Sequence, residues 1–212
     1  MRSEQFAFPD VQRPDSAIAL VSPLYVATAT QQRTAAAHSV AAFRNNPLPA
    51  GFVSFSAFGS TDGETLLTYA QWATDDAYLR FDDSHDHDHA RSGRVQPVRF
   101  LPYRSVVLDP ESRPGVLVAP TFDVDGPERQ RASVDALLDG PLSRPVPGLI
   151  ASHFHLSLDG TRVLNWAEWV DESAHADFMR SPLPAEFLSA ITMPGVRGIG
   201  GKRYELLESV TT

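Results

Sequence analysis

The chain has 212 residues, enough for one large domain or two small ones, and its 42% apolar and 21% charged residues are ordinary for a globular protein. Its formal net charge of −8 argues against nucleic acid and against an anionic membrane surface as partners. Cysteine is absent, which excludes disulfides and thiolate nucleophiles, and Lys202 is the only lysine, which argues against a Schiff base or a phosphate-binding loop.

Residues 1–15 are predicted to form an N-terminal extension ahead of the first strand. They lack the apolar core of a signal peptide, and no run in the chain approaches the roughly 18 apolar residues of a membrane span. We therefore expect a cytoplasmic protein.

A first set of elements is predicted over residues 16–110, in the order strand, helix, strand, strand, helix, strand. The first helix is clearest where alanines gather, in QQRTAAAHSVAAFR. The next two strands meet at Asp62-Gly63, a dipeptide typical of hairpin turns, and Thr74 is placed to cap the second helix. The outer strands are expected at Ala17–Val26 and Arg99–Leu108.

The stretch DDSHDHDHARSGR, residues 82–94, alternates aspartate with histidine. Such side chains are able to bind a divalent metal, and His85 and His89 would be among the ligands. Nothing in the stretch fixes a coordination geometry, so the alternative is a solvated loop or a frayed helix end. For the chain as a whole we predict no bound metal.

Turn-forming residues gather in DPESRPG, residues 109–115, and a second set of the same elements is predicted over residues 115–208. Its first helix, ERQRASVDALLDG, is expected to end at Gly140, and its hairpin to turn at Asp159-Gly160. Asp171 is placed to cap the second helix. The outer strands are expected at Val116–Val124 and Lys202–Leu207.

The second set repeats the first with a displacement of 97 residues, since LVSP at residue 20 returns as LVAP at residue 117. The same register matches several landmark residues: Gly51 with Gly148, Asp62-Gly63 with Asp159-Gly160, Tyr69 with Trp166, Trp72 with Trp169 and Phe81 with Phe178. Landmarks kept in register over so much of the chain indicate a tandem duplication.

The order β-α-β-β-α-β is that of a ferredoxin-like unit. The helices of such a unit cover one face of its antiparallel sheet, so the other face must be buried by something else. The sequence therefore predicts an α+β protein of two tandem ferredoxin-like units, whose sheets pack into one intrachain, pseudo-dimeric α/β barrel.

The repeated motif YxxW, followed by T/D-x-x-A-x-x-x-F, resembles the antibiotic biosynthesis monooxygenase family of the dimeric α/β-barrel superfamily. The resemblance covers residues 16–108 and 115–208. It implies an enzyme, a cofactor-independent monooxygenase that oxidises an aromatic polyketide from anthrone to quinone by way of a stabilised enolate. The implied partners are that small aromatic polyketide and O2.

Studied members of the family carry the pattern N-x-x-x-W on the third strand, which Asn165 and Trp169 match here. Alternation along a strand puts both side chains, with the small Ala167 between them, on one face. An amide NH2 and an indole N–H suit an oxyanion on a planar phenolic substrate, and a donor aimed at such a charge is worth about 3–4 kcal/mol. The first unit has Thr68 and Trp72 instead, so we expect the active site in the second unit.

Histidines supply the candidate bases. His153 and His155 alternate along one strand and share a face, where a neutral imidazole could deprotonate a phenol or enol; a polar strand face is the alternative. We predict that Asn165, Trp169, His153 and His155 are catalytic. Five further residues are predicted to bind the substrate, with packing in the core as the alternative for the tryptophans: Trp72, Trp166, His175, Phe178 and Met179.

Other hypotheses stay open. One is haem binding or degradation, with His85 or His89 as the axial ligand. A second is a ring-cleaving oxygenase that takes reduced flavin from solution, since no GxGxxG cradle is present. A third is an accessory protein that binds a polyketide without transforming it. A barrel that closes within one chain is compatible with a monomer and with a homodimer.

Overall fold

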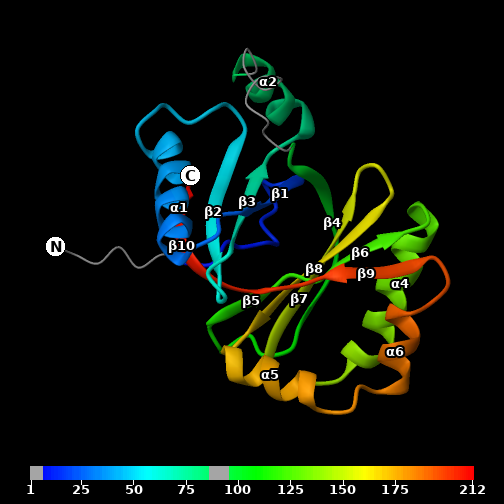
Figure 1. The fold of residues 1–212 in the computed structure, drawn as a ribbon. Coiled ribbons are helices and arrows are strands. Elements are labelled where there is room, and N and C mark those ends of the chain that lie inside the picture. The colour runs from blue at the N-terminus through cyan, green and yellow to red at the C-terminus, as the bar shows by residue number, and fades with distance from the viewer. Residues whose placement is uncertain (1–6, 86–95) are drawn as a thin grey trace. The chain divides into compact units, whose positions relative to one another are not determined.

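The computed structural model describes residues 7–85 and 96–212 (Figure 1). The chain divides into two compact units, unit 1 with Met1–Phe100 and Leu206–Thr212, and unit 2 with Leu101–Glu205. No helix in the described ranges is long and apolar enough to cross a membrane. The predicted α+β class and the two ferredoxin-like units are confirmed, as the strand pairing within each unit shows.

Unit 1 has the predicted order of elements. They are β1 (Ile18–Tyr25), α1 (Ala29–Arg44), β2 (Phe52–Ser60), β3 (Thr65–Trp72), α2 (Asp75–His85) and β4 (Val98–Val107). The strands pair antiparallel in the order β4-β1-β3-β2, in which the first strand lies between the third and the fourth. This split arrangement defines the ferredoxin-like unit.

The core of unit 1 lies between the sheet and its helices. Ala36 and Val40 of α1 pack with Phe55 and Ala57 of β2 and Trp72 of β3. Alanine favours the α1 helix, and Thr28 caps it by accepting a hydrogen bond from the Gln31 amide. The predicted cap of α2 is confirmed as well, because the Thr74 hydroxyl accepts from the Ala77 amide at 3.1 Å.

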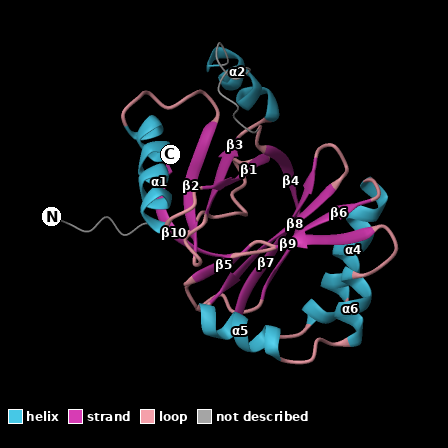
Figure 2. Cartoon of the chain, viewed as in Figure 1, coloured by secondary structure: helices cyan, strands magenta, loops and turns pink. Residues whose placement is uncertain are grey.

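Unit 2 repeats the arrangement with two additional breaks. Its elements are β5 (Val116–Val118), β6 (Thr121–Val124), α4 (Pro127–Asp139), the 3-10 turn η1 (Pro141–Ser143), β7 (Leu149–Ser157), β8 (Arg162–Trp169), α5 (Glu172–Arg180), α6 (Ala185–Ile191), β9 (Val196–Gly200) and β10 (Arg203–Thr211). The strands pair in the order β9-β6-β8-β7, which corresponds to β4-β1-β3-β2 of unit 1. Helices α4, α5 and α6 lie on one side of this sheet (Figure 2).

One predicted strand of unit 2 is wrong in its continuity. The strand expected at Val116–Val124 is split into β5 and β6 at Pro120, which has no backbone N–H to give to a ladder. The predicted closing strand at Lys202–Leu207 corresponds to β10, and a break at Gly201 separates it from the additional strand β9. The two breaks face each other, because a Cβ on Gly201 would lie 2.9 Å from Pro120 Cα.

A buried glutamine ties the first helix of each unit to the hairpin, a feature that the sequence analysis did not predict. Gln32 Nε2 donates to Ser60 O, Ser60 Oγ and Thr65 O at 3.1, 3.3 and 2.8 Å. Gln130 Nε2 makes the same three bonds in unit 2, to Ser157 O, Ser157 Oγ and Arg162 O at 3.1, 3.3 and 2.8 Å. The two units therefore match in polar contacts inside the core as well.

The chain passes from one unit to the other in the middle of two strands. Residues 101–107 of β4 belong to unit 2, where β4 neighbours β7, and residues 206–211 of β10 belong to unit 1, where β10 neighbours β2. Leu207 and Val210 accordingly pack on the core of unit 1. The boundaries of the compact units thus differ from the repeat boundaries at 110 and 115.

Candidate active site

The stretch Asn165 to Trp169 lies on β8, the third strand of unit 2. Ala167 and Trp169 belong to the core that α4 covers with Val134 and Leu137, so this face of the strand points toward the helices. Asn165 shares the face, as the alternation along a strand requires. The site predicted around Asn165 therefore lies between the sheet and the helices of unit 2.

The Asn165 side chain is held by its neighbour on β7. Ser152 Oγ donates to Asn165 Oδ1 at 2.6 Å, and the Asn165 backbone amide donates to Pro120 O at 2.9 Å. Within the described chain the Asn165 amide nitrogen has no hydrogen-bond partner, and the residue is half-buried. With its oxygen engaged by Ser152, the amide presents its NH2 group as a free donor.

Trp169 is 3% exposed, and its indole N–H is buried without a hydrogen-bond partner in the described ranges. Leaving a buried donor unpaired costs about 1–3 kcal/mol, which is why such groups are rare in folded proteins. The ring packs edge-on against His175, with centroids 5.1 Å apart, and against Phe178 at 5.4 Å. The unpaired N–H makes Trp169 a candidate donor to a ligand.

His175 is held in this site by Arg203. Its Nδ1 accepts a hydrogen bond from Arg203 Nε at 3.0 Å, and Arg203 forms an ion pair with Glu172 at 2.6 Å. Burial and the charge of Arg203 lower the pKa of His175 below its ordinary value, partly offset by Glu172. An arginine only donates, so the lone pair of the neutral ring lies on Nδ1 and its proton on Nε2.

Unit 1 has a related but different constellation at Thr68, Trp72 and Tyr78. The Trp72 indole N–H is likewise buried without a partner in the described ranges, and Tyr78 packs edge-on against it at 5.9 Å. Burial, reinforced by Asp82, raises the pKa of Tyr78 above its ordinary value. The Thr68 hydroxyl donates to Ser22 O at 3.3 Å, so unit 1 offers no free amide where unit 2 has Asn165.

The structure places His153 and His155 on the opposite face of the sheet from Asn165. His153 pairs across the strands with Trp166, the neighbour of Asn165 on β8, so both histidines face away from the helices. His153 Nδ1 lies 2.8 Å from Ser105 Oγ. The structure therefore does not bring these histidines together with Asn165 and Trp169, and their catalytic role stays a prediction.

His155 lies on the same face, away from the helices. It is fully buried, its Nδ1 lies 3.2 Å from the backbone oxygen of His153, and burial together with His153 lowers its pKa to about 3. Trp166 lies on this second face too, where its indole donates to Glu168 Oε1 at 3.2 Å. Because side chains alternate between the two faces of a strand, His153, His155 and Trp166 lie on the face opposite to Asn165 and Trp169.

The remaining predicted residues divide in the same way. Phe178 contacts Trp169 and belongs to the site, whereas Met179 is 55% exposed on the outer side of α5. Trp72 belongs to the constellation of unit 1. The His85 to His89 tract, considered as a metal site or a haem ligand, lies outside the described residues apart from the backbone of His85.

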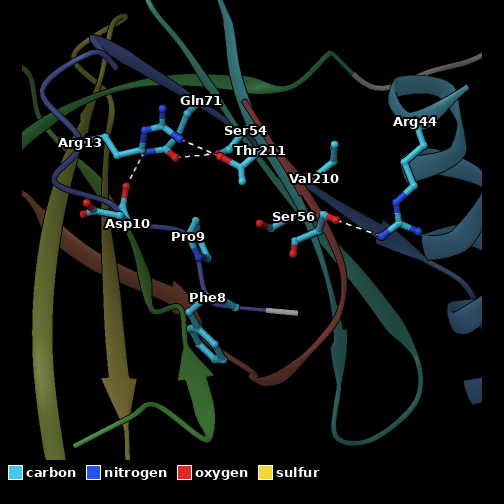
Figure 3. A pocket seen from close by; sticks show the side chains of 12 residues that line it. Phe8, Pro9, Asp10, Arg13, Arg44, Ser54, Ser56, Gln71, Val210 and Thr211 are labelled. Atoms are coloured by element: carbon cyan, nitrogen blue, oxygen red, sulfur yellow. Dashed lines mark hydrogen bonds between the residues drawn. The ribbon is translucent and has the colours of Figure 1, made fainter. Parts of the chain in front are cut away.

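Unit 1 contains a cavity of about 520 Å³ that the sequence analysis did not predict (Figure 3). It lies on the sheet face that carries Ser54, Ser56 and Gln71, and the N-terminal segment forms another part of its wall. In the sequence, the cavity corresponds to the alternation of the small polar residues Ser54 and Ser56 along β2.

Comparison with known proteins adds three similarities, although no family model matches the chain. Over 57 residues it is 42% identical to tetracenomycin-F1 monooxygenase from Streptomyces glaucescens. The match covers 24% of this chain and 51% of the relative, so the chain spans about half the length of that curated relative. A solved anthrone oxidase-like protein has 15% identity and a TM-score of 0.73 over 93% of this chain and 94% of its own, which shows the same fold. A Streptomyces coelicolor monooxygenase, solved with nanaomycin D, has 33% identity over 47% of this chain and 88% of its own, with a TM-score of 0.37.

Proposed function

We propose that the chain is a member of the antibiotic biosynthesis monooxygenase family and that it oxidises an aromatic polyketide with O2. The reaction is the conversion of an anthrone-type methylene to the carbonyl of a quinone. We place it at Asn165, Trp169 and His175 of unit 2. The protein needs no bound metal or flavin for this reaction, because the substrate itself supplies the electrons.

The observation that supports the proposal most strongly is the unpaired, buried indole N–H of Trp169. Two further donors accompany it, the NH2 group of Asn165 and the Nε2 proton of His175. Asn165 and Trp169 are four residues apart on an extended strand, so their Cα atoms are separated by about 13 Å. Two donors on one face of the strand can bind different oxygen atoms of one planar polycyclic phenol.

These donors favour the negatively charged form of the substrate. Deprotonation of the anthrone gives a carbanion that is delocalised as an enolate, and hydrogen bonds to the enolate oxygen lower the pKa of the substrate. A preorganised donor in a water-poor site costs no reorganisation when the charge develops, and each is worth about 3–4 kcal/mol. The half-buried Asn165 and the buried Trp169 would supply this stabilisation.

The enolate then reduces O2 by one electron, and the resulting radical pair combines to form a peroxide at the methylene carbon. Loss of the remaining C–H proton and cleavage of the O–O bond give the quinone carbonyl and one molecule of water. The two hydrogens of the methylene thus leave in water, and one oxygen atom stays in the product. In this sequence the protein stabilises the anion and excludes water from the intermediates.

The test is oxygen uptake by the colourless purified protein with 1,8-dihydroxyanthrone, without added flavin or metal. We expect uptake above the spontaneous rate, together with the absorbance of the quinone. Asn165→Ala should lower kcat by roughly a hundredfold, as expected for the loss of one donor to an oxyanion. The matched control is Thr68→Ala at the corresponding position of unit 1, which should leave kcat unchanged.

The other outcomes separate the alternatives. Uptake that requires reduced flavin would replace the proposal with a flavin-assisted oxygenase. Tight binding of the anthrone without uptake would identify an accessory binding protein. Equal losses in Asn165→Ala and Thr68→Ala would contradict the assignment of the site to unit 2.

A further inference from the structure

The cavity of unit 1 has a polar floor whose hydrogen bonds are almost complete (Figure 3). Gln71 is 1% exposed, and both ends of its amide are engaged: Oε1 accepts from Ser54 Oγ at 2.6 Å, and Nε2 donates to Asp10 O at 2.9 Å. The second of these bonds fixes the N-terminal segment over the sheet. The cavity is therefore part of the folded unit and not a gap between loose segments.

Ser56 is the exception among the polar residues of the floor. The residue is 1% exposed, lines the cavity, and its hydroxyl has no hydrogen-bond partner within the described ranges. A hydroxyl that offers one donor and two lone pairs in an otherwise satisfied wall is an anchor for a ligand oxygen. Ser54 adds acceptor capacity beside it, because its own proton goes to Gln71.

The charges around the cavity disfavour an anionic ligand. Arg13 is paired with Asp15 at 2.7 Å, and Arg44 with Glu208 at 2.8 Å, so neither guanidinium is available as a free cation. Asp10, at the rim, adds a carboxylate that has no ion pair in the described chain. With both arginines already paired and Asp10 beside them, the cavity offers a phosphate or a carboxylate no unpaired cation.

The rest of the wall is apolar and in part aromatic. Phe8, Pro9 and Val210 line the cavity, and the Phe8 ring is held edge-on against Phe58 with centroids 5.4 Å apart. A volume of about 520 Å³ lies within the range of small-molecule sites, which is roughly 300–1,000 Å³.

From these features we propose that the cavity is a second binding site, for an uncharged hydroxylated aromatic molecule of about three fused rings. The molecule lies against Phe8 and Pro9 and exchanges a hydrogen bond with Ser56. The site is on the sheet face that carries Ser56, whereas Trp72 of the same unit points to the helix-facing core. The class of ligand rests on the proposed function, but the binding itself does not require turnover.

The test is calorimetric titration with 1,8-dihydroxyanthraquinone, which has no methylene to oxidise. We expect two sites per chain. Ser56→Phe should abolish one of them by filling the cavity, and Asn165→Ala should weaken only the other. Thr34→Phe, which adds a ring on the exposed face of α1 in the same unit, is the matched control and should keep both sites.

Circular dichroism checks whether Ser56→Phe folds. If it does not, a second and smaller substitution tests the same site. Ser56→Ala removes only the hydroxyl and should weaken the cavity site by about fivefold, the effect of one lost hydrogen bond. Anthraquinone-2-sulfonate, which is anionic, should bind the cavity at least tenfold more weakly than the neutral probe. A single site that none of the Ser56 variants affects would overturn the proposal, even if the protein oxidises anthrones at Asn165.

Discussion

Two tryptophans at corresponding positions, Trp72 and Trp169, share one unusual property. Each buries its indole N–H without a hydrogen-bond partner in the described chain. Phenylalanine keeps an aromatic ring and removes only the donor and part of the volume. We expect Trp169→Phe to lower kcat for anthrone oxidation about tenfold or more, and Trp72→Phe to leave it unchanged.

The measurement is oxygen uptake at saturating anthrone, combined with thermal unfolding of both variants. Similar shifts in Tm would show that the two substitutions disturb packing to the same extent. In that case only a difference in kcat distinguishes a ligand-binding donor from a core residue, and its absence would assign Trp169 to the core.

His155 predicts how stability depends on pH. Its pKa is about 3 in the folded protein, below the ordinary value near 6.5 that the unfolded chain has. Protons therefore bind the unfolded state more strongly, and stability is lost as pH falls from about 6.5 toward 3. At pH 5 the loss from this residue is about 2 kcal/mol.

Phe58 occupies the corresponding position of unit 1, so His155→Phe is a substitution that the repeat itself suggests. We expect the variant to lose less stability than the parent between pH 7.5 and pH 5, measured by urea unfolding. His175, whose pKa is also lowered, keeps its smaller share in both proteins. If parent and variant lost the same free energy of unfolding between pH 7.5 and pH 5, another group would be responsible for the loss of stability in acid.

At the scale of elements, the glutamine in the first helix of each unit joins that helix to the hairpin by hydrogen bonds. Gln130→Leu removes three hydrogen bonds and leaves buried backbone oxygens of Ser157 and Arg162 without this donor. We expect a loss of about 3 kcal/mol in the free energy of unfolding. Gln32→Leu should cost about the same, because its three distances equal those of Gln130. Chemical unfolding of the two variants checks both values.

Most elements could be predicted from the sequence because the signals were local. Asp62-Gly63 and Asp159-Gly160 form the hairpin turns, with Gly63 and Gly160 at φ of +80° and +76°, and Asp171 caps α5. The splitting of the strand at Pro120 could not be predicted in this way. Pro23, at the matching position, stays inside the continuous strand β1, so the missing N–H alone does not explain the break; Pro120 also lies close to Gly201.

The candidate site was predicted in part for a similar reason. The shared face of Asn165 and Trp169 follows from the strand period alone. The role of His175 depends on Arg203, which lies on β10 and is 28 residues away in the sequence, and no local pattern announces that contact. The cavity at Ser56 needs the N-terminal segment to fold back on β2 and β3, which is equally nonlocal.

At the scale of the whole molecule, the crossing of β10 makes unit 1 depend on residues that follow unit 2 in the sequence. Deleting residues 206–212 removes the strand beside β2, the packing of Leu207 and Val210, and the ion pair of Arg44 with Glu208. Hydrogen exchange should then show loss of protection in β2 and retention in β7 and β8.

Peptide-resolved exchange of the parent and the truncated protein measures this directly, and removal of Thr212 alone is the control. Protection lost equally in β2 and in β8 would mean that the two units open as one cooperative body. The prediction of separable opening would then be wrong.

Asn165 and Thr68 stand at matching positions of one polypeptide, and this has a practical consequence. In an assembly of two identical chains, every substitution is made twice, and a molecule altered on one side only has to be sorted from a mixture of tagged subunits. Here one codon alters one side. The four combinations of asparagine and threonine at these two positions are therefore four ordinary genes, and the independence of the two halves becomes a question that single purified proteins answer.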